Sequence, residues 1–191
     1  MKILFIDTET GGLDCKTSAL IQMSGIIRID GKDVDKFNYF IKPFPGSEVN
    51  EKALEVQGRT KEEVMGSNYL SEQEIYNDFI GKLDTYIDKF DKTDKFIVAG
   101  YNVKFDINFL NEFFRRNGNP YLFSYISGAT LDPLSYIPLL QLLNKLPKLR
   151  NDKLGTWCEY FNIPLDAHDS FNDIVATKKL IGETVRIIQE G

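Results

Sequence analysis

The hydrophobic and polar positions of the chain begin with an almost wholly apolar run at residues 2–6, which ends in polar residues. A short continuous run of this kind is typical of a strand buried on both faces. Residues 19–30 and 33–41 instead alternate apolar and polar positions around a turn at residues 30–32. This alternation predicts an antiparallel hairpin with a tight turn.

Beyond the hairpin, short apolar runs alternate with segments in which apolar residues recur at helical spacing. Strands are expected at residues 96–99 and near 129–131. Helices are expected at residues 51–57 and 72–89, after the strand at 96–99, and in three later segments, of which one covers 154–161 and the last carries an apolar stripe of Phe171, Ile174, Val175, Ile181, Val185 and Ile188. A three-strand meander followed by strand–helix alternation predicts an α/β fold.

The size and composition of the chain fit one catalytic module. A length of 191 residues is sufficient for one sizeable core and too short for two typical domains, so residues 1–191 are expected to form a single domain. Apolar runs stay well below about 20 residues and the first residues lack a signal-like pattern, which predicts a soluble, cytoplasmic protein without a membrane partner. Cys15 and Cys158 lack metal-ligand spacing and are expected to be free thiols.

The charge of the chain limits the ways in which it could bind nucleic acid. A net charge of −5 argues against a protein that covers long stretches of a strand. An enzyme that binds only the end of a strand needs fewer basic side chains. The strongest basic run either contacts phosphates or is a solvated loop; it consists of Lys145, Lys148, Arg150 and Lys153.

Two carboxylates follow the first predicted strand directly. Side chains alternate along a strand, so Asp7 and Glu9 are expected on one side and Thr8 on the other. Two acids a few ångströms apart raise one another's pKa unless a cation lies between them. Hard divalent ions such as Mg²⁺ or Mn²⁺ suit an all-oxygen site, whereas the alternative is a solvated acidic turn.

Two further acids lie far along the chain. Asp106 is expected in the first turn of the helix after residues 96–99, facing the carboxyl end of that strand. An acid there also stabilises the helix dipole, so Asp106 alone is a weak indication of chemistry. Asp173 lies on the last predicted helix.

His168 is the only histidine of the chain and lies five residues before Asp173. It is the only side chain whose unperturbed pKa lies near neutrality, so proton transfer at pH 7 is attributed to it first. Five helical residues turn through about 500°, which would place the two side chains about 140° apart. For both side chains to reach one site, His168 must lie in the loop before the helix, with Asp169 or Ser170 as the N-cap.

These residues together resemble the three motifs of the DnaQ-like 3′–5′ exonucleases. The motifs are Asp7-Thr8-Glu9, then Asn102 with Asp106, then His168 with Asp173, in an order and context that extend from residue 3 to about 180. The histidine marks the DEDDh variant, typified by the proofreading subunit of polymerase III; ribonuclease T and oligoribonuclease are its RNA-directed relatives. The resemblance implies an RNase H-like fold, in which a mixed sheet of a three-strand antiparallel meander and parallel strands is flanked by helices.

The resemblance also implies a role for each site residue. Two Mg²⁺ or Mn²⁺ ions would be held by Asp7, Glu9, Asp106 and Asp173, and His168 would be the general base. The substrate-binding positions would be Thr8, Thr10 and Leu13, in the loop that encloses the terminal 3′-hydroxyl, and Asn102. Many relatives have histidine before that asparagine, whereas this chain has Tyr101, which puts only a peripheral contact in doubt.

The sequence therefore predicts a metal-dependent exonuclease that releases nucleoside 5′-monophosphates from the 3′ ends of single-stranded or frayed DNA by two-metal-ion hydrolysis. The nearest alternative is trimming of RNA or short oligoribonucleotides, a choice that depends on how the pocket treats a 2′-hydroxyl. A different class of function is a subunit that binds nucleic-acid ends or a DNA polymerase without cutting.

Overall fold

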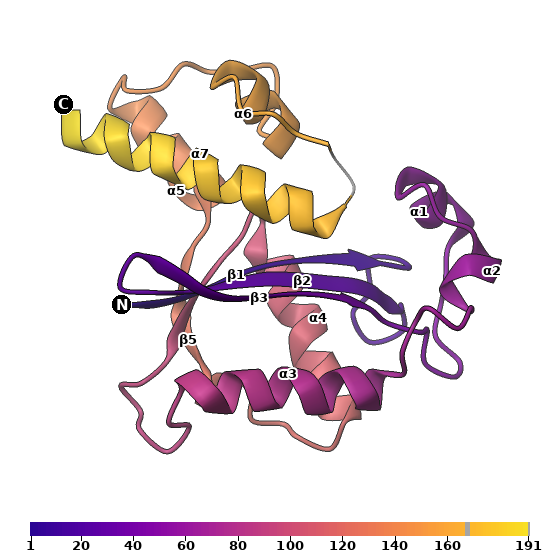
Figure 1. Cartoon of the computed structure of the whole chain (residues 1–191). Helices are drawn as coiled ribbons and strands as arrows, with labels where there is room; N and C mark the ends of the chain where they lie inside the picture. The colour runs from indigo at the N-terminus through magenta and orange to yellow at the C-terminus, as the bar shows by residue number, and fades with distance from the viewer. Residues whose placement is uncertain (167–168, 191) are drawn as a thin grey trace.

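A mixed five-stranded sheet lies at the centre of the computed structural model, which describes residues 1–166 and 169–190 (Figure 1). The strand order is β3-β2-β1-β4-β5. The first three strands pair antiparallel, whereas β4 pairs parallel with β1 and β5 parallel with β4. The strands are β1 (Lys2–Thr10), β2 (Leu20–Ile29), β3 (Lys32–Phe40), β4 (Phe96–Ala99) and β5 (Ile126–Leu131). The predicted α/β class and meander are confirmed.

The hairpin of β2 and β3 turns through Asp30 and Gly31, whose φ angles are 47° and 84°. Two successive residues with positive φ make the tight turn whose twist matches that of antiparallel strands. Aspartate and glycine tolerate this backbone better than most residues do. The predicted hairpin is therefore confirmed, with bounds that differ by about one residue.

Helices cover both faces of the sheet, with α3 and α4 on one side and α7, α5 and α6 on the other (Figure 1). The helices are α1 (Glu51–Val56), α2 (Lys61–Val64), α3 (Glu72–Tyr86), α4 (Val103–Arg116), α5 (Pro133–Leu142), α6 (Leu154–Tyr160) and α7 (Ser170–Glu190), with a short 3₁₀ helix, η1 (Leu122–Ser124). The sequence pattern did not predict α2 and η1, and α3 ends three residues earlier than expected.

The side chains of β1 pack into two different cores. Leu4 and Ile6 lie in the core formed with α3 and α4, whereas Ile3 and Phe5 pack with Ile174 of α7. This two-sided burial explains the continuous apolar run at the start of the chain. The same alternation places the next odd-numbered residues of β1, Asp7 and Glu9, on the α7 side of the sheet.

The last helix begins where the capping pattern predicts. The carboxylate of Asp169 accepts a hydrogen bond of 3.1 Å from the backbone N–H of Asn172, so Asp169 is the N-cap of α7. The expected apolar stripe of this helix is partly wrong, because Val185 and Ile188 are exposed. There α7 packs against α5 rather than the sheet, and the buried residues are Leu180 and Thr184 among others.

Within the described part of the chain, none of the helices is both long and apolar enough to span a membrane.

Candidate active site

The loop after β1 is held tightly against neighbouring segments. A Cβ atom on Gly11 would lie 2.6 Å from the carbonyl oxygen of Glu48, and one on Gly12 would lie 2.5 Å from the hydroxyl of Ser18. At Gly11 only glycine fits this close approach of two backbones, whereas at Gly12 a Cβ atom would meet the side chain of Ser18. The packed turn leaves the next side chain, Leu13, 88% exposed at its outer edge.

Three of the predicted acids converge at the end of β1. One carboxylate oxygen from each of Asp7, Glu9 and Asp173 lies within 4.8 Å of those of the other two. Asp7 and Glu9 come from the α7 side of β1, and Asp173 from the first turn of α7. Residues that lie 166 positions apart in the sequence therefore form one cluster.

The fourth acid, Asp106, reaches this strand end from the other side of the sheet. It is buried in the first turn of α4, and the hydroxyl of Thr8 donates a 2.7 Å hydrogen bond to its carboxylate. The grouped oxygens described above do not include Asp106. Its charge nevertheless contributes to raising the pKa of Asp7, so the four acids share one electrostatic environment.

Burial and mutual repulsion make the acids hard to ionise without a cation. Burial, followed by the charges of Asp106 and Asp173, raises the pKa of Asp7 well above its usual value. Burial and the charge of Asp173 raise the pKa of Glu9 to about 7, although Arg59 opposes this. Burial also raises the pKa of Asp106 to about 7 against the hydrogen bond from Thr8. A divalent cation would offset this repulsion.

The donor set of the cluster fits such a cation. Carboxylate oxygens are the ligands that Mg²⁺ and Mn²⁺ prefer, and buried carboxylates are retained when they are paired or bind a metal. Asp7, Glu9 and Asp173 converge closely enough to hold one together. Asp106 lies near the same strand end but outside this group of oxygens.

A cleft of about 510 Å³ opens beside the acids and could receive a strand end. Thr8, Glu9, Thr10 and Leu13 line one side of it. The lining also includes residues of α1, its C-cap and α4 that the sequence pattern did not single out: Lys52, Ala53, Val56, Gln57 and Phe105. In the sequence, Phe105 belongs to the apolar stripe of its helix and the others have an ordinary helical pattern, so nothing distinguished them there.

Asn102 occupies the sharp turn between β4 and α4. Its φ angle of 59° lies in the left-handed region, which asparagine tolerates better than most residues. The backbone N–H groups of Asn102 and Val103 both donate to the carboxylate of Asp132, which fixes the start of the helix that carries Asp106. Tyr101, the departure from the family pattern, donates its hydroxyl to the carbonyl of Asp152.

The general base predicted from the motif, His168, lies outside the described residues. Its sequence neighbour Asp169 is described and caps α7, four residues before Asp173.

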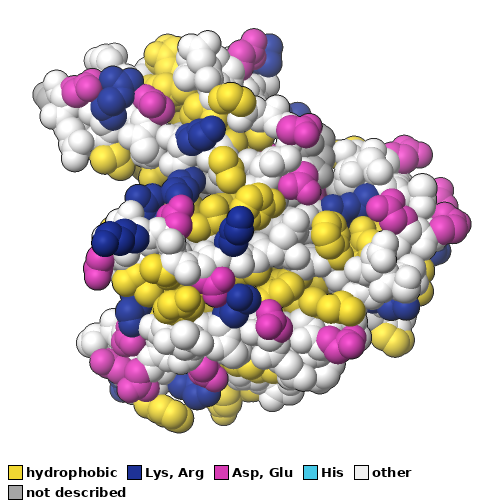
Figure 2. All heavy atoms as spheres, in the orientation of Figure 1, with side chains coloured by type: hydrophobic (Ala, Val, Ile, Leu, Met, Phe, Trp, Pro, Cys, Tyr) yellow, Lys and Arg dark blue, Asp and Glu magenta, His cyan; other side chains and the backbone are white. Residues whose placement is uncertain are grey.

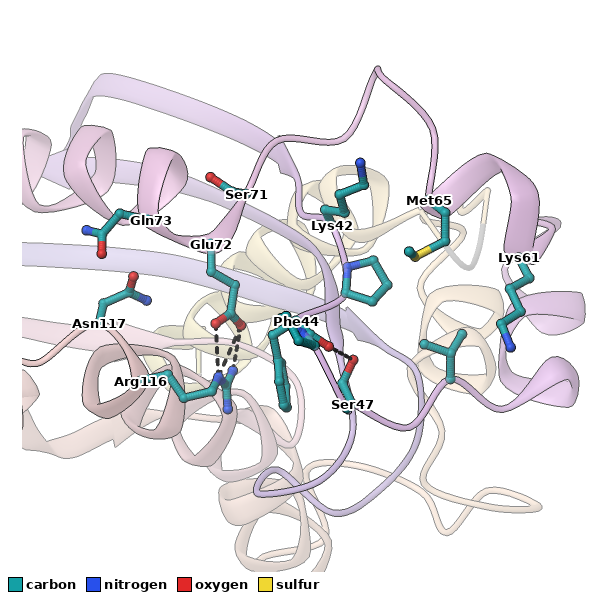
Figure 3. Close-up of a pocket in the computed structure, with 14 residues that line it drawn as sticks. Lys42, Phe44, Ser47, Lys61, Met65, Ser71, Glu72, Gln73, Arg116 and Asn117 are labelled. Atoms are coloured by element: carbon teal, nitrogen blue, oxygen red, sulfur yellow. Dashed lines mark hydrogen bonds and ion pairs between the residues drawn. The ribbon is translucent and has the colours of Figure 1, made fainter.

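A larger cavity, of about 780 Å³, lies elsewhere between the loop at residues 42–49, α2, and the adjoining ends of α3 and α4 (Figure 3). The guanidinium of Arg116 lies 4.3 Å from the ring centre of Phe44 and forms a 2.7 Å ion pair with Glu72. The described candidate site residues do not line this cavity. The acids and their adjoining cleft therefore remain the candidate active site, although their cleft is smaller.

On one face of the molecule, basic side chains are mixed with acidic ones. In Figure 2, lysine and arginine side chains lie among acidic ones over the visible surface. In the predicted basic run, Arg150 pairs with Glu159 at 2.9 Å. The face visible in Figure 2 therefore carries no continuous basic track along which a strand could lie.

A family model matches most of the chain. The family model RNase T, described as "Exonuclease", matches residues 4–181. The chain belongs to this exonuclease family. The predicted resemblance to DnaQ-like exonucleases is thus confirmed, and the chain is an exonuclease-family hydrolase.

Curated relatives of this exonuclease domain are much longer polymerases. The DNA polymerase III PolC-type of Pediococcus pentosaceus is 29% identical over 167 residues, which cover 87% of this chain and 10% of the relative. That of Thermotoga maritima is 27% identical over 186 residues, which cover 97% of this chain and 12% of the relative. The chain spans about a tenth of the length of these relatives.

Solved structures share the fold of the domain. Exonuclease I of E. coli in complex with a dT13 oligonucleotide aligns with a TM-score of 0.77 at 21% identity, over 97% of this chain and 40% of that one. Another structure of exonuclease I gives a TM-score of 0.78 at 21% identity, over 99% of this chain and 42% of that one. This similarity confirms the mixed sheet flanked by helices.

Proposed function

We propose that residues 1–191 form a single metal-dependent 3′–5′ exonuclease domain of the DEDDh type, which releases nucleoside 5′-monophosphates from the 3′ end of single-stranded or frayed DNA. The observation that carries this proposal is the convergence of Asp7, Glu9 and Asp173 beside a cleft lined by the loop after β1. Crowded carboxylates next to an open cleft are expected at catalytic sites.

The acids have the role of holding the cofactor. Asp7, Glu9, Asp106 and Asp173 would hold two divalent cations, Mg²⁺ or Mn²⁺. When bound, such cations supply the positive charge that offsets the charge developing on the phosphate. The hydroxyl of Thr8 keeps the carboxylate of Asp106 in place through their hydrogen bond.

His168 would accept the proton of the attacking water. The water oxygen forms a bond to phosphorus, the bond from phosphorus to the 3′-oxygen of the preceding nucleotide breaks, and that oxygen takes up a proton from solvent to become the new 3′-hydroxyl. The terminal nucleotide then leaves as a 5′-monophosphate. A neutral imidazole suits this step, because its usual pKa of about 6.5 leaves it mostly unprotonated above pH 7.

The loop after β1 would bind the 3′ end of the strand. The hydroxyl of Thr10 donates a 2.7 Å hydrogen bond to the carbonyl of Gly12 and so stabilises the turn. The exposed side chain of Leu13 is free to pack against the terminal base. Asn102, next to the helix of Asp106, remains a predicted substrate contact.

We propose DNA as the substrate and a DNA polymerase as a partner, and two comparisons support this choice. A structural relative, exonuclease I of E. coli, is solved in complex with dT13. The sequence relatives are polymerases of the PolC type. The alternative substrate is RNA, and a comparison of matched DNA and RNA strands distinguishes the two.

The proposal is tested with 5′-labelled single-stranded DNA, duplex DNA and RNA of one sequence, in Mg²⁺ or Mn²⁺. We expect a ladder of products shortened from the 3′ end, fastest on single-stranded DNA. A 3′-phosphate should block digestion and a 5′-phosphate should not. Cutting of a closed circle, or equal digestion of both phosphorylated strands, contradicts an exonuclease of this polarity.

The variant Asp7→Asn is expected to abolish turnover while the protein remains folded, because Asp7 is the most crowded of the acids. Single-turnover digestion and thermal unfolding measure the two effects. Asp91→Asn, which changes an exposed acid, is the control and should retain full activity. Digestion by Asp7→Asn within a few-fold of the wild-type rate contradicts the assignment.

A further inference from the structure

Two polar side chains of β2 lie directly opposite the acids of β1. In the antiparallel register, Glu9 pairs with Gln22 and Asp7 pairs with Ser24. Directly paired residues project to the same face of a sheet, so both polar residues lie beside the acid cluster. Gln22 and Ser24 are fully buried. Buried polar groups in proteins almost always form hydrogen bonds, so the partners of these two side chains indicate what they hold in place.

Gln22 connects three separate parts of the chain. Its amide nitrogen donates to the carboxylate of Asp169 at 3.3 Å and to the side chain of Asn38 at 2.7 Å. Its amide oxygen accepts from the guanidinium of Arg59, in the segment between α1 and α2. A guanidinium has only donors, so it attracts the amide oxygen and thereby directs the amide nitrogen toward Asp169.

Asp169 in turn fixes the first turn of α7. Its carboxylate caps the helix at Asn172, and its carbonyl oxygen accepts from the backbone N–H of Asp173 at 3.0 Å. A second contact, 2.5 Å between the hydroxyls of Ser24 and Ser170, joins β2 to the same turn. A displacement of Asp169 would therefore move Asp173 relative to the acids of β1.

The other end of this connection lies at the substrate cleft. Gln57, at the end of α1, lines the cleft and donates a 2.9 Å hydrogen bond to the carbonyl of Thr10. Arg59 follows it by two residues and is held over the ring of Phe40 at 5.4 Å. The wall of the cleft and the start of α7 are thus joined by the path from Arg59 through Gln22 to Asp169.

We propose that Arg59 and Gln22 are positioning residues, which hold Asp169 and so keep Asp173 aligned with the acids of β1 while α1 contacts the nucleic-acid strand. This inference rests on the proposed exonuclease function. It assigns a role in the reaction to residues outside the three motifs.

The test reverses the hydrogen bond between Gln22 and Asp169. Gln22→Glu places an acceptor against the carboxylate, and Asp169→Asn places a donor against the amide, so each single variant loses the bond. The double variant restores it with donor and acceptor exchanged and with the net charge unchanged. Gln22→Met removes the bond without adding charge.

We expect each single variant to lower kcat by roughly 10-fold to 100-fold on single-stranded DNA, with KM nearly unchanged, since a small misplacement of reacting groups is costly. The double variant should return to within about threefold of the wild-type kcat. Arg59→Met should lower kcat and Arg59→Lys should lower it less, because lysine keeps a donor and the charge.

The control is Thr184→Val, which removes the 3.0 Å contact with Tyr136 from a buried site farther along α7. It should lower stability and retain the wild-type kcat. A wild-type kcat in Gln22→Met overturns the proposal. So does a double variant whose loss of kcat is as large as the product of the losses in the two single variants.

A wild-type protein that digests no strand refutes the proposed function instead. In that case the same variants are compared by their free energies of unfolding, where additive effects of Gln22→Glu and Asp169→Asn would still overturn the hydrogen-bond coupling.

Discussion

Replacing Glu9 by glutamine should stabilise the metal-free protein at pH 8 and change its stability little at pH 5. Burial and the charge of Asp173 raise the pKa of Glu9 from 4.5 to about 7. At about 1.4 kcal/mol per pH unit, this corresponds to about 3.5 kcal/mol of unfavourable ionisation in the folded protein. Solvent around the partly exposed carboxylate screens part of this cost, so we expect about 2 kcal/mol.

The direction of the pH dependence follows from proton binding. The pKa of Glu9 is higher in the folded than in the unfolded protein, so the folded protein binds more protons between pH 4.5 and 7. Stability therefore falls as the pH rises through this window and is constant above it. Glutamine does not ionise, so the variant does not lose this stability as the pH rises.

Urea unfolding in EDTA, followed by the fluorescence of the buried Trp157, measures the difference between wild type and variant at both pH values. Addition of Mg²⁺ at pH 8 should stabilise the wild type more than the variant, because binding to the folded state adds to its stability. Glu55→Gln, at an exposed position of α1, is the control. An equal difference at pH 5 and pH 8, or a less stable variant at pH 8, would refute the electrostatic reasoning.

Three further substitutions test other parts of the site. Thr8→Val should lower the free energy of unfolding by about 1.5–3 kcal/mol at pH 8 and by less at pH 5, where Asp106 is protonated; urea unfolding at both pH values measures this. His168→Ala should lower kcat by roughly 10² to 10⁴ and remove the acidic limb of the pH profile without changing the melting temperature; an active but destabilised variant contradicts a general base. Gly11→Ala should destabilise the protein by about 1–3 kcal/mol, because its Cβ would meet the carbonyl of Glu48; thermal unfolding measures the loss.

Local patterns were sufficient to predict much of the sheet. Alternation along β1 correctly separates Thr8 from its neighbours: its hydroxyl bonds to Asp106 of α4, whereas Glu9 faces α7. The turn residues at 30–31 predict the hairpin because few residues adopt positive φ. These features depend on a few adjacent residues, which a single sequence displays directly.

Features that depend on contacts between residues far apart in the sequence could not be predicted from local patterns. The stripe on α7 is wrong at Val185 and Ile188 because a helix pattern does not show where the helix leaves the sheet and meets α5. Gln22 and Ser24 do leave a signal, since these two polar residues interrupt the otherwise non-polar residues 20–27 at alternate positions. Their partners, Asp169 and Ser170, lie about 146 residues away and only the fold reveals them.

The distribution of the acids along the chain sets the order in which the nuclease matures. Asp7 and Glu9 belong to the first strand, whereas Asp173 arrives with α7, which must dock on β1 and β2 before the cluster exists. A ribosome releases the first strand well before that helix, and a domain generally folds as a unit. On the proposed function, an incomplete chain cannot cut nucleic acid. Cutting begins only after α7 has packed on the sheet.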